Sequence, residues 1–343
     1  MAKKINNYCK QPKMPVRVFN KNVSKNRAAY ILSNGTRWVN GTQIKYMFFS
    51  GATAQKNIVR RAFEIWANLG IGISFIEVNK RADSMVRIAF DHSDGSWSYV
   101  GREILKIGKN EKTMNFGWDL TADAYGMTTA LHEIGHTLGL QHEHQSPFSG
   151  ITWDTEKVYK QFAGEPNNWT KSETHSNIIE KLSANKVLGS SWDPKSIMEY
   201  EFEAGLILKP VKYKNGIYPP GILSANDIKG IKKIYPKIKA SAVKKVDHKS
   251  TVSINVTSGN QSDFLFVAPE SKTYTFETKG DLDTVMVIHE KGEKENYYLA
   301  GDDDSGVEKN AKITLPLIKG KKYLVNIRAL YAPKNKKGTL SIK

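Results

Sequence analysis

Apolar side chains in the first 236 residues follow two periods, one typical of helices and one typical of strands. Residues 57–67 carry apolar side chains at helical spacing, which predicts a helix with one buried face. Residues 43–49 and 85–90 are predicted as strands, and a capping-box sequence at 224–227 predicts a last helix that ends before Pro236. Helices and strands are therefore mixed in one domain of the α+β class, whose length is ample for a core.

Beyond about residue 239 the pattern changes to short alternating stretches with turns between them, such as 274–278 and 323–327. Strands of this kind predict a small all-β sandwich. We find no apolar run long enough to cross a membrane, and Met1 is not followed by the apolar stretch of a signal peptide. No membrane partner is therefore expected.

The balance of charge favours acidic partners, because 51 Lys and Arg against 34 Asp and Glu give a formal net charge of +17. Nucleic-acid binding is the obvious alternative for such a basic chain. However, lysine pairs such as 232–233, 244–245 and 336–337 are dispersed, and no nucleic-acid motif accompanies them. We predict a solvated basic surface and no nucleic-acid partner.

The most specific signal is the eleven-residue run from His132 to His142. His132 and His136 stand four positions apart, so that both imidazoles lie on one helix face and can bind one metal ion. Glu133 can reach a water held on that metal and take its proton as general base. Gly139 suits the left-handed backbone that ends a helix, after which the chain can bring His142 to the metal. Three neutral histidines leave a fourth position open, which is typical of catalytic zinc.

Two alternatives bear on this site. A short His-Glu-x-x-His string can form a solvated or buried cluster without metal, but the longer form with a glycine and a third histidine is much rarer by chance. His144 stands two positions beyond His142 and could compete as third ligand. Only His142 has the three-residue offset from the glycine, so we predict that His142 binds the metal.

A second motif at residues 196–200, Ser-Ile-Met-Glu-Tyr, is similar to the methionine-containing turn of the metzincin clan. With Glu143 directly after the third histidine, the two motifs resemble the astacin family of zinc endopeptidases. The resemblance implies a two-lobed α+β catalytic domain with a zinc-binding helix. It also implies that Met198 forms an apolar floor under the imidazoles, and that Tyr200 is a displaceable fifth zinc ligand that stabilises the oxyanion. Taken alone, Met198 and Tyr200 would be interpreted as ordinary core residues.

The resemblance extends over most of the first 236 residues. Residues 37–42 are similar to the opening of the family's mature domain, and residues 95–101 to a segment near the edge strand that pairs with extended substrate. Animal members carry paired disulfides, whereas Cys9 is the single cysteine here and excludes an intramolecular disulfide. This departure favours the bacterial branch of the family.

Residues 1–27 are predicted to be a propeptide, because Ala28 stands about where mature astacins begin. An activating protease would cut after Arg27, and the resemblance implies that the new amine of Ala28 pairs with Glu143. The aspartate-containing blocking segment of many astacin precursors has no match. Cys9 is the natural substitute, since its thiolate could occupy the open position on zinc until the segment is removed. The alternative is a lone thiol without a role in a basic tail.

Residues 239–343 resemble the bacterial pre-peptidase C-terminal domain through segments 263–267, 275–284 and 302–306. The resemblance implies a role in secretion, in substrate attachment or as a part that is clipped off, and the sequence does not choose among these. Acidic loop residues could hold calcium if the loops converge, although such residues are more often solvated turns. They are Asp281, Asp283, Asp302, Asp303 and Asp304.

These motifs together predict a secreted, latent zinc endopeptidase that acts as a monomer on protein or peptide substrates. Its predicted parts are a propeptide (1–27), an astacin-like peptidase domain (28–238) and a β-sandwich domain (239–343). The alternative is a matrix- or surface-binding protein whose C-terminal domain carries the function. Glu133→Ala separates the two, because it should abolish hydrolysis and leave binding intact. A third hypothesis is an intracellular effector that acts on one host protein.

Overall fold

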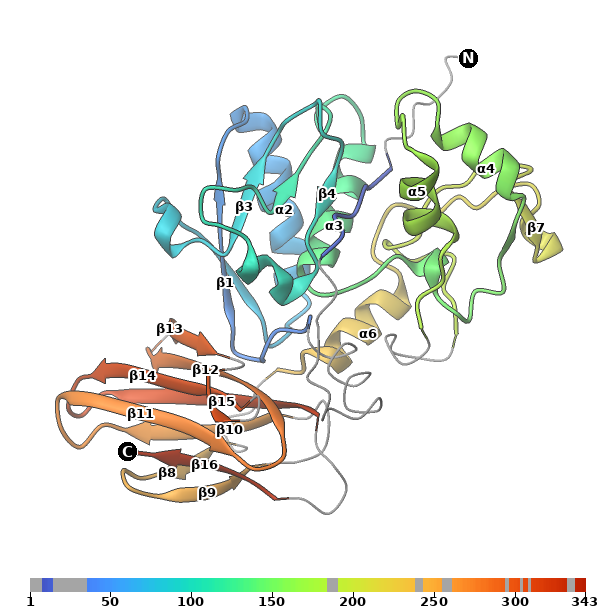
Figure 1. The fold of residues 1–343 in the computed structure, drawn as a ribbon. Coiled ribbons are helices and arrows are strands. Elements are labelled where there is room, and N and C mark those ends of the chain that lie inside the picture. Colours follow the sequence, from blue (N-terminus) through green and yellow to red (C-terminus); the bar gives the residue numbers. More distant parts are fainter. Residues whose placement is uncertain are drawn as a thin grey trace. The chain divides into compact units, whose positions relative to one another are not determined.

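The computed structural model describes residues 8–14, 36–183, 191–237, 243–254, 261–293, 296–302, 305–307, 310–331 and 337–343. These residues belong to two compact units. The first draws on Met1–Arg17, Lys45–Leu69 and Phe75–Lys233, and the second on Val18–Ile44, Gly70–Ser74 and Ile234–Lys343. The first mixes helices with a sheet and the second holds the later strands, which confirms the predicted fold class (Figure 1).

A five-stranded sheet lies on one side of the metal-binding sequence. Its strands are β1 (Gln43–Phe48), β2 (Ser74–Glu77), β3 (Val86–Ala89), β4 (Trp97–Ser98) and β5 (Met114–Asn115). Their order is β2-β1-β3-β5-β4. β1 and β5 each run parallel to β3, whereas β4 runs antiparallel to β5. The predicted strands at 43–49 and 85–90 are therefore confirmed, and β4 forms an edge of the sheet.

Two long helices pack together beside this sheet, α2 (Thr53–Ala67) and α3 (Tyr125–Thr137). α2 begins four residues before the prediction of 57–67, because its first turn is polar and shows no apolar periodicity. Its most buried residues include Phe63 and Trp66, and the Trp66 indole donates a hydrogen bond of 3.1 Å to the Leu131 carbonyl on α3. This contact fixes the helix that carries the metal-binding sequence.

The chain after α3 builds a second lobe from short elements. These are β6 (Thr152–Trp153), α4 (Thr155–Phe162), α5 (Lys171–Thr174), a π-helical turn (His175–Ile179), β7 (Ile207–Lys209) and α6 (Ala225–Ile234), with 3-10 turns at Glu143–Gln145 and Val211–Tyr213. Two further 3-10 turns, Arg81–Asp83 and Gly101–Lys106, lie before α3, between strands of the five-stranded sheet. Aromatic side chains such as Phe162, Trp169 and Phe202 form the core of this lobe. The predicted capping box is confirmed, because Ser224 and Asp227 exchange hydrogen bonds of 2.8 and 2.9 Å and α6 ends before Pro236.

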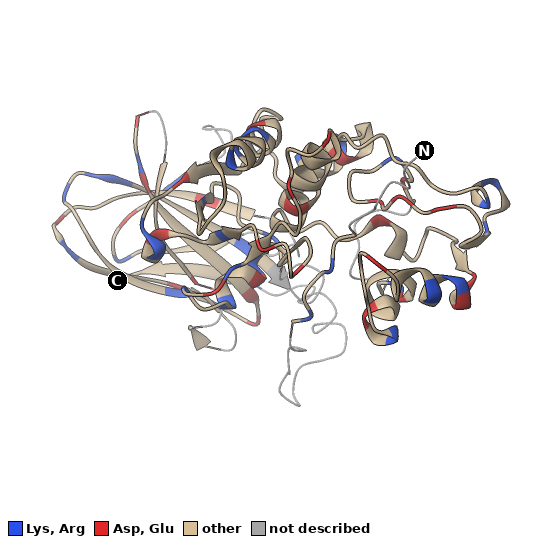
Figure 2. Ribbon diagram, turned by 90° about the horizontal axis from the view of Figure 1, so that it is seen from above, with Lys and Arg blue, Asp and Glu red and all other residues tan. Residues whose placement is uncertain are grey.

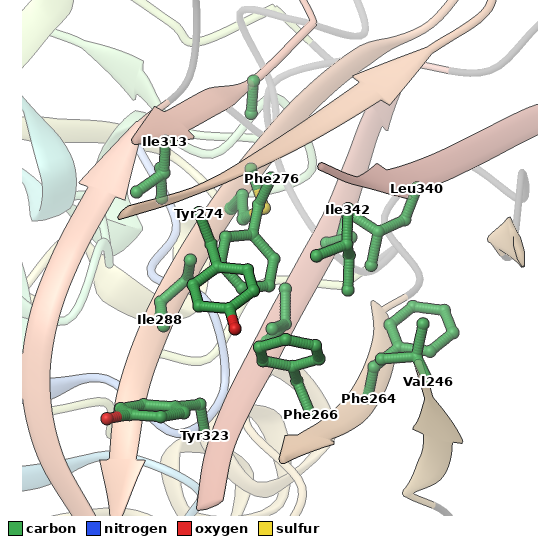
Figure 3. Packing of buried hydrophobic residues seen from close by; sticks show 14 of the residues in the cluster. Val246, Phe264, Phe266, Tyr274, Phe276, Ile288, Ile313, Tyr323, Leu340 and Ile342 are labelled. Carbon is green, nitrogen blue, oxygen red and sulfur yellow. The ribbon is translucent and has the colours of Figure 1, made fainter. Parts of the chain in front are cut away.

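The second unit is a β-sandwich of two sheets. Their orders are β13-β12-β15-β10-β8 and β14-β11-β16-β9. The strands are β8 (Lys244–Val246), β9 (Thr251–Ile254), β10 (Gln261–Val267), β11 (Lys272–Lys279), β12 (Asp283–Lys291), β13 (Asn296–Asp302), β14 (Lys312–Leu317), β15 (Lys322–Tyr331) and β16 (Gly338–Ile342). Phe266, Phe276 and Ile342 meet with other apolar side chains between the sheets (Figure 3). The strands predicted at 274–278 and 323–327 lie inside β11 and β15.

Residues from early in the chain also pack on this sandwich. Asn40 and Gln261 exchange two hydrogen bonds, of 2.7 and 3.0 Å, and Val39 packs against Val285 and Val287. All of these residues belong to the second compact unit. The compact units therefore do not follow a single cut in the sequence.

Charged residues are interleaved along both units. In Figure 2, Lys and Arg occur on helices, strands and loops and alternate with Asp and Glu. Within the described ranges, no helix combines the length and the apolar character that crossing a bilayer requires.

Candidate zinc site

The helix α3 places three of the predicted site residues. His132, Glu133 and His136 are buried in its last two turns. The helix ends at Thr137, and Gly139 adopts a φ of 90°, the left-handed conformation that glycine allows. The chain then turns back, and His142 reaches the same place from beyond the helix.

Four side chains converge at this point. The ligand atoms of Cys9, His132, His136 and His142 all lie within 4.8 Å of one another, and all four residues are buried. In the part of the chain that the structure describes, these four residues form the group of side chains that could hold a metal ion. Cys9, predicted only as a candidate ligand, is thus brought from the N-terminal segment to the histidines.

Each imidazole is oriented by an acceptor on its far side. Nδ1 of His132 lies 2.8 Å from the Ile197 carbonyl, and Nδ1 of His136 lies 2.9 Å from the Leu140 carbonyl. Nδ1 of His142 lies 3.2 Å from Oε1 of Gln145. Carbonyl oxygens only accept, so each Nδ1 carries the hydrogen, and each Nε2 presents a lone pair to the centre.

The arrangement of these lone pairs fits a cation. Burial lowers the pKa of His132 to about 4 and holds the pKa values of His136 and His142 well below the usual range, so that all three rings are neutral. Nε2 of His136 and Nε2 of His142 lie 3.0 Å apart, and two lone pairs at that distance repel. Tetrahedral zinc with Zn–N bonds of about 2.0–2.1 Å would hold its ligand nitrogens roughly 3.3 Å apart. The three residues therefore fit zinc.

Glu133 lies beside this centre and is fully buried. Burial raises its pKa to about 8, while the Cys9 thiol, which donates a hydrogen bond of 3.5 Å to Oε2, opposes that rise. Glu133, Cys9 and Tyr200 also line a small cavity of about 30 Å³, which is enough for a water molecule. A carboxylate beside a metal and a water-sized space can exchange protons with that water.

The methionine-containing turn lies under the histidines. Met198 is 2% exposed, and a Cβ added to Gly135 of α3 would collide with its sulfur, so the helix and the turn are in close contact. The Tyr200 hydroxyl lies 2.9 Å from Nε2 of His142 and donates a hydrogen bond to the Cys9 carbonyl. Tyr200 thus lies next to the metal-binding atoms, and its role as a displaceable zinc ligand stays a prediction.

Two neighbours of His142 have other partners. His144 stacks on His142, but its Nε2 lies 2.9 Å from the Asn177 carbonyl and its ring is not part of the metal-binding group. Oε1 of Glu143 accepts a hydrogen bond of 2.8 Å from the Asp193 amide, and burial raises the pKa of Glu143 to about 7. The predicted cut at Arg27 and the amine of Ala28 lie outside the described residues.

Sequence reasoning missed the residues that hold the first ligand. The Asp227 carboxylate accepts hydrogen bonds from the Ser196 hydroxyl, at 2.6 Å, and from the Ile197 amide, at 2.8 Å. The Ile197 carbonyl in turn accepts from His132, so that the start of α6 is connected to a metal ligand. The sequence identifies Asp227 only as a helix cap, and the Ile197 carbonyl, a backbone group, leaves no signal in residue type.

The N-terminal segment lies along the cleft beside the metal-binding residues. Cys9 forms a parallel bridge with Ser96, next to the edge strand β4, and the Lys10 amide donates a hydrogen bond of 2.9 Å to the Ser96 carbonyl. The Tyr8 hydroxyl donates one of 2.6 Å to the Glu201 carbonyl. An extended segment therefore occupies the sheet edge beside the zinc site.

The structure does not support the predicted calcium site. The described acidic residues of the sandwich form no metal-binding group, and Asp303 and Asp304 lie outside the described residues. The Asp302 carboxylate accepts hydrogen bonds from the Ser305 amide, at 3.1 Å, and from the Lys312 amide, at 2.7 Å. Its role is that of a turn residue.

Comparison with known proteins agrees with this geometry. The family model described as "Astacin", a family of peptidases, matches residues 31–235. Bone morphogenetic protein 1 of Xenopus laevis is 30% identical over 205 residues, which are 54% of this chain and 25% of that protein. The zinc metalloproteinase dpy-31 of Teladorsagia circumcincta is 27% identical over 219 residues, 60% of this chain and 32% of that protein. The chain thus spans about a quarter to a third of these curated relatives.

A solved structure of myroilysin is also similar. It is 33% identical, with a TM-score of 0.55, and the match covers 60% of this chain and 98% of that one. The family match stops at residue 235, so the resemblance of the later strands to a pre-peptidase C-terminal domain stays a prediction. On the family match and this structural likeness, the chain belongs to the astacin family of peptidases.

Proposed function

We propose that the chain is a secreted zinc endopeptidase of protein substrates that its own N-terminal segment keeps latent. The observation that carries this proposal is the convergence of three neutral imidazoles, each with Nε2 turned inward, beside the buried carboxyl of Glu133. Membership of a peptidase family supports the same activity.

His132, His136 and His142 would hold the zinc. Bound there, zinc would supply a Lewis acid and lower the pKa of water. Glu133 would take a proton from the attacking water and pass it to the leaving amine, since its side chain lines the water-sized cavity beside the three imidazoles. Tyr200, released from the Cys9 carbonyl, would donate its hydrogen bond to the oxyanion that forms from the substrate carbonyl.

Latency would follow from two features of the N-terminal segment. The Cys9 sulfur lies among the metal-binding atoms, where a thiolate could fill the fourth position on zinc. The segment also pairs with the sheet edge at Ser96, which an extended substrate would need. Removal of the segment after Arg27 would free both places. Secretion is consistent with the use of latency, because an active endopeptidase threatens the cell that makes it.

The test is casein hydrolysis by the purified chain before and after limited trypsin treatment, with the new N-terminus read by mass spectrometry. We expect chelator-sensitive activity to appear as a fragment that begins at Ala28 accumulates. Glu133→Ala should abolish activity without preventing cleavage of the segment, and Cys9→Ala should raise activity before trypsin treatment. Clean removal of the segment from a zinc-loaded chain that hydrolyses no substrate would contradict the proposal and favour a binding function.

A further inference from the structure

Next to the zinc site, one lysine of the N-terminal segment forms an ion pair with a carboxylate in the cleft. Nζ of Lys10 lies 2.6 Å from Oε1 of Glu173, with side chains 40% and 33% exposed. Lys10 directly follows the residue that reaches the zinc site, so its side chain marks the neighbouring position along the cleft. The ion pair with Lys10 is the main cause that lowers the pKa of Glu173 to about 2.

The Glu173 carboxylate is held in place independently of Lys10. Its other oxygen, Oε2, accepts hydrogen bonds from the Thr170 amide, at 2.8 Å, and from the Thr170 hydroxyl, at 2.9 Å. These bonds belong to the capping box that opens α5. One oxygen therefore anchors the side chain, and the other faces the cleft and would remain there once the segment has left.

The surroundings of Glu173 suit a cationic side chain. A cleft of about 490 Å³ lies here, lined by Trp97, Tyr99 and Asn177 as well as by Glu173 and the segment itself. The nearby carboxylate of Asp94 already has a partner, Nζ of Lys112 at 2.8 Å. Among the contacts of the described residues, Lys10 is the cation paired with Glu173.

We propose that Glu173 is a specificity-determining residue that selects lysine or arginine in the substrate, at the position beside the scissile bond that Lys10 marks. The inference rests on the proposed peptidase function. When the segment is removed, Glu173 loses its cation, and a substrate that pairs with the same sheet edge can supply another. Both basic side chains fit, because each carries a donor at the end of a flexible stem.

The preference should be modest, because the ion pair is partly exposed to water. Pairs of this kind correspond to roughly a two- to fivefold difference in affinity. Glu173→Gln removes the charge but keeps the capping box, which accepts glutamine at this position. Glu173→Lys reverses the charge and should reverse the preference. Glu156→Gln, an exposed substitution on α4 outside the lining of the cleft, is the matched control.

The first measurement uses binding and not hydrolysis. The trypsin-activated protein carrying Glu133→Ala is titrated with a fluorescent peptide of the sequence Tyr8–Met14 and with its Lys10→Gln version. We expect the lysine peptide to bind two- to fivefold more tightly, and the ratio to fall to about one with Glu173→Gln but not with Glu156→Gln. A ratio that Glu173→Gln leaves unchanged would overturn the inference.

The second measurement maps cleavage sites in a peptide library with the activated protein that retains Glu133. Lysine and arginine should be enriched at one position flanking the cleaved bond, and Glu173→Gln should remove that enrichment. Enrichment that persists in Glu173→Gln would overturn the inference. Because binding is measured separately, a complete lack of cleavage by every variant would count against the proposed peptidase function and not against the cationic subsite.

Discussion

Asp227 connects the start of α6 to the first zinc ligand, so the loss of its side chain should affect both the helix and the metal site. Its carboxylate accepts from the Ser196 hydroxyl and from the Ile197 and Ser224 amides, at 2.6 to 2.8 Å. The Ile197 carbonyl orients His132 from 2.8 Å. We therefore predict that Asp227→Ala destabilises the fold and weakens zinc binding.

The loss of stability depends on the hydrogen-bond donors that are left without an acceptor and not on the charge that is removed. Burial raises the pKa of Asp227 in spite of its donors, so the ionised carboxylate is not itself strongly favoured in the fold. The Ser196 hydroxyl is free to rotate, but two backbone amides in a partly buried site would lose their acceptor. At about 1–3 kcal/mol each, they predict a loss of about 2–5 kcal/mol out of a total stability of about 5–15 kcal/mol.

Zinc affinity should fall about 10- to 100-fold, the usual effect of losing a group that orients a ligand. Urea unfolding followed by tryptophan fluorescence measures the first effect, and competition with a chelator measures the second. Asp227→Asn tests the cause, because its amide oxygen can still accept from the two backbone donors, and we expect a loss below about 1 kcal/mol. Asp119→Ala, in an exposed turn, is the control. A stability of Asp227→Ala within about 0.5 kcal/mol of wild type, with unchanged zinc affinity, would refute this reasoning.

Three further predictions concern the same unit. Gly126→Ala should lower the melting temperature, because the new Cβ would collide with the Leu120 carbonyl oxygen. The gain in helix propensity of about 1 kcal/mol is smaller than the cost of moving the backbone. The control is Gly230→Ala, which has open space around it and should be neutral or stabilising. Burial lowers the pKa of Lys181 to about 8, so between pH 8 and 10.5 the unfolded chain binds more protons than the folded chain. Over this range, the unfolding free energy of wild type relative to that of Lys181→Met should rise with pH by about 1–2 kcal/mol, as measured by urea titration at each pH. A difference that does not change with pH would contradict the buried position of Lys181. Chelation of zinc should lower the melting temperature of wild type but not of His132→Ala, and equal shifts in both would show that the stabilising metal binds elsewhere.

Much of the zinc site could be predicted because its parts are close in sequence. A spacing of four on a helix places His132 and His136 on one face by the geometry of α3 alone, and Gly139 marks the point where the helix has to end. The capping box at Ser224 was predictable for the same reason, since it is complete within one turn. The start of α2 was not, because polar first turns carry no periodicity.

The remaining contacts join residues that the sequence keeps far apart. Cys9 contacts Glu133, which is 124 positions away, and His132 is oriented by a backbone carbonyl 65 positions away. Lys10 forms an ion pair with Glu173 of the second lobe. Sequence by itself determined which residues could bind zinc, because local backbone geometry sets their spacing. Only the tertiary structure decided which groups orient those ligands and which carboxylate the N-terminal segment covers, because such pairings result from the packing of the whole core and leave no local pattern.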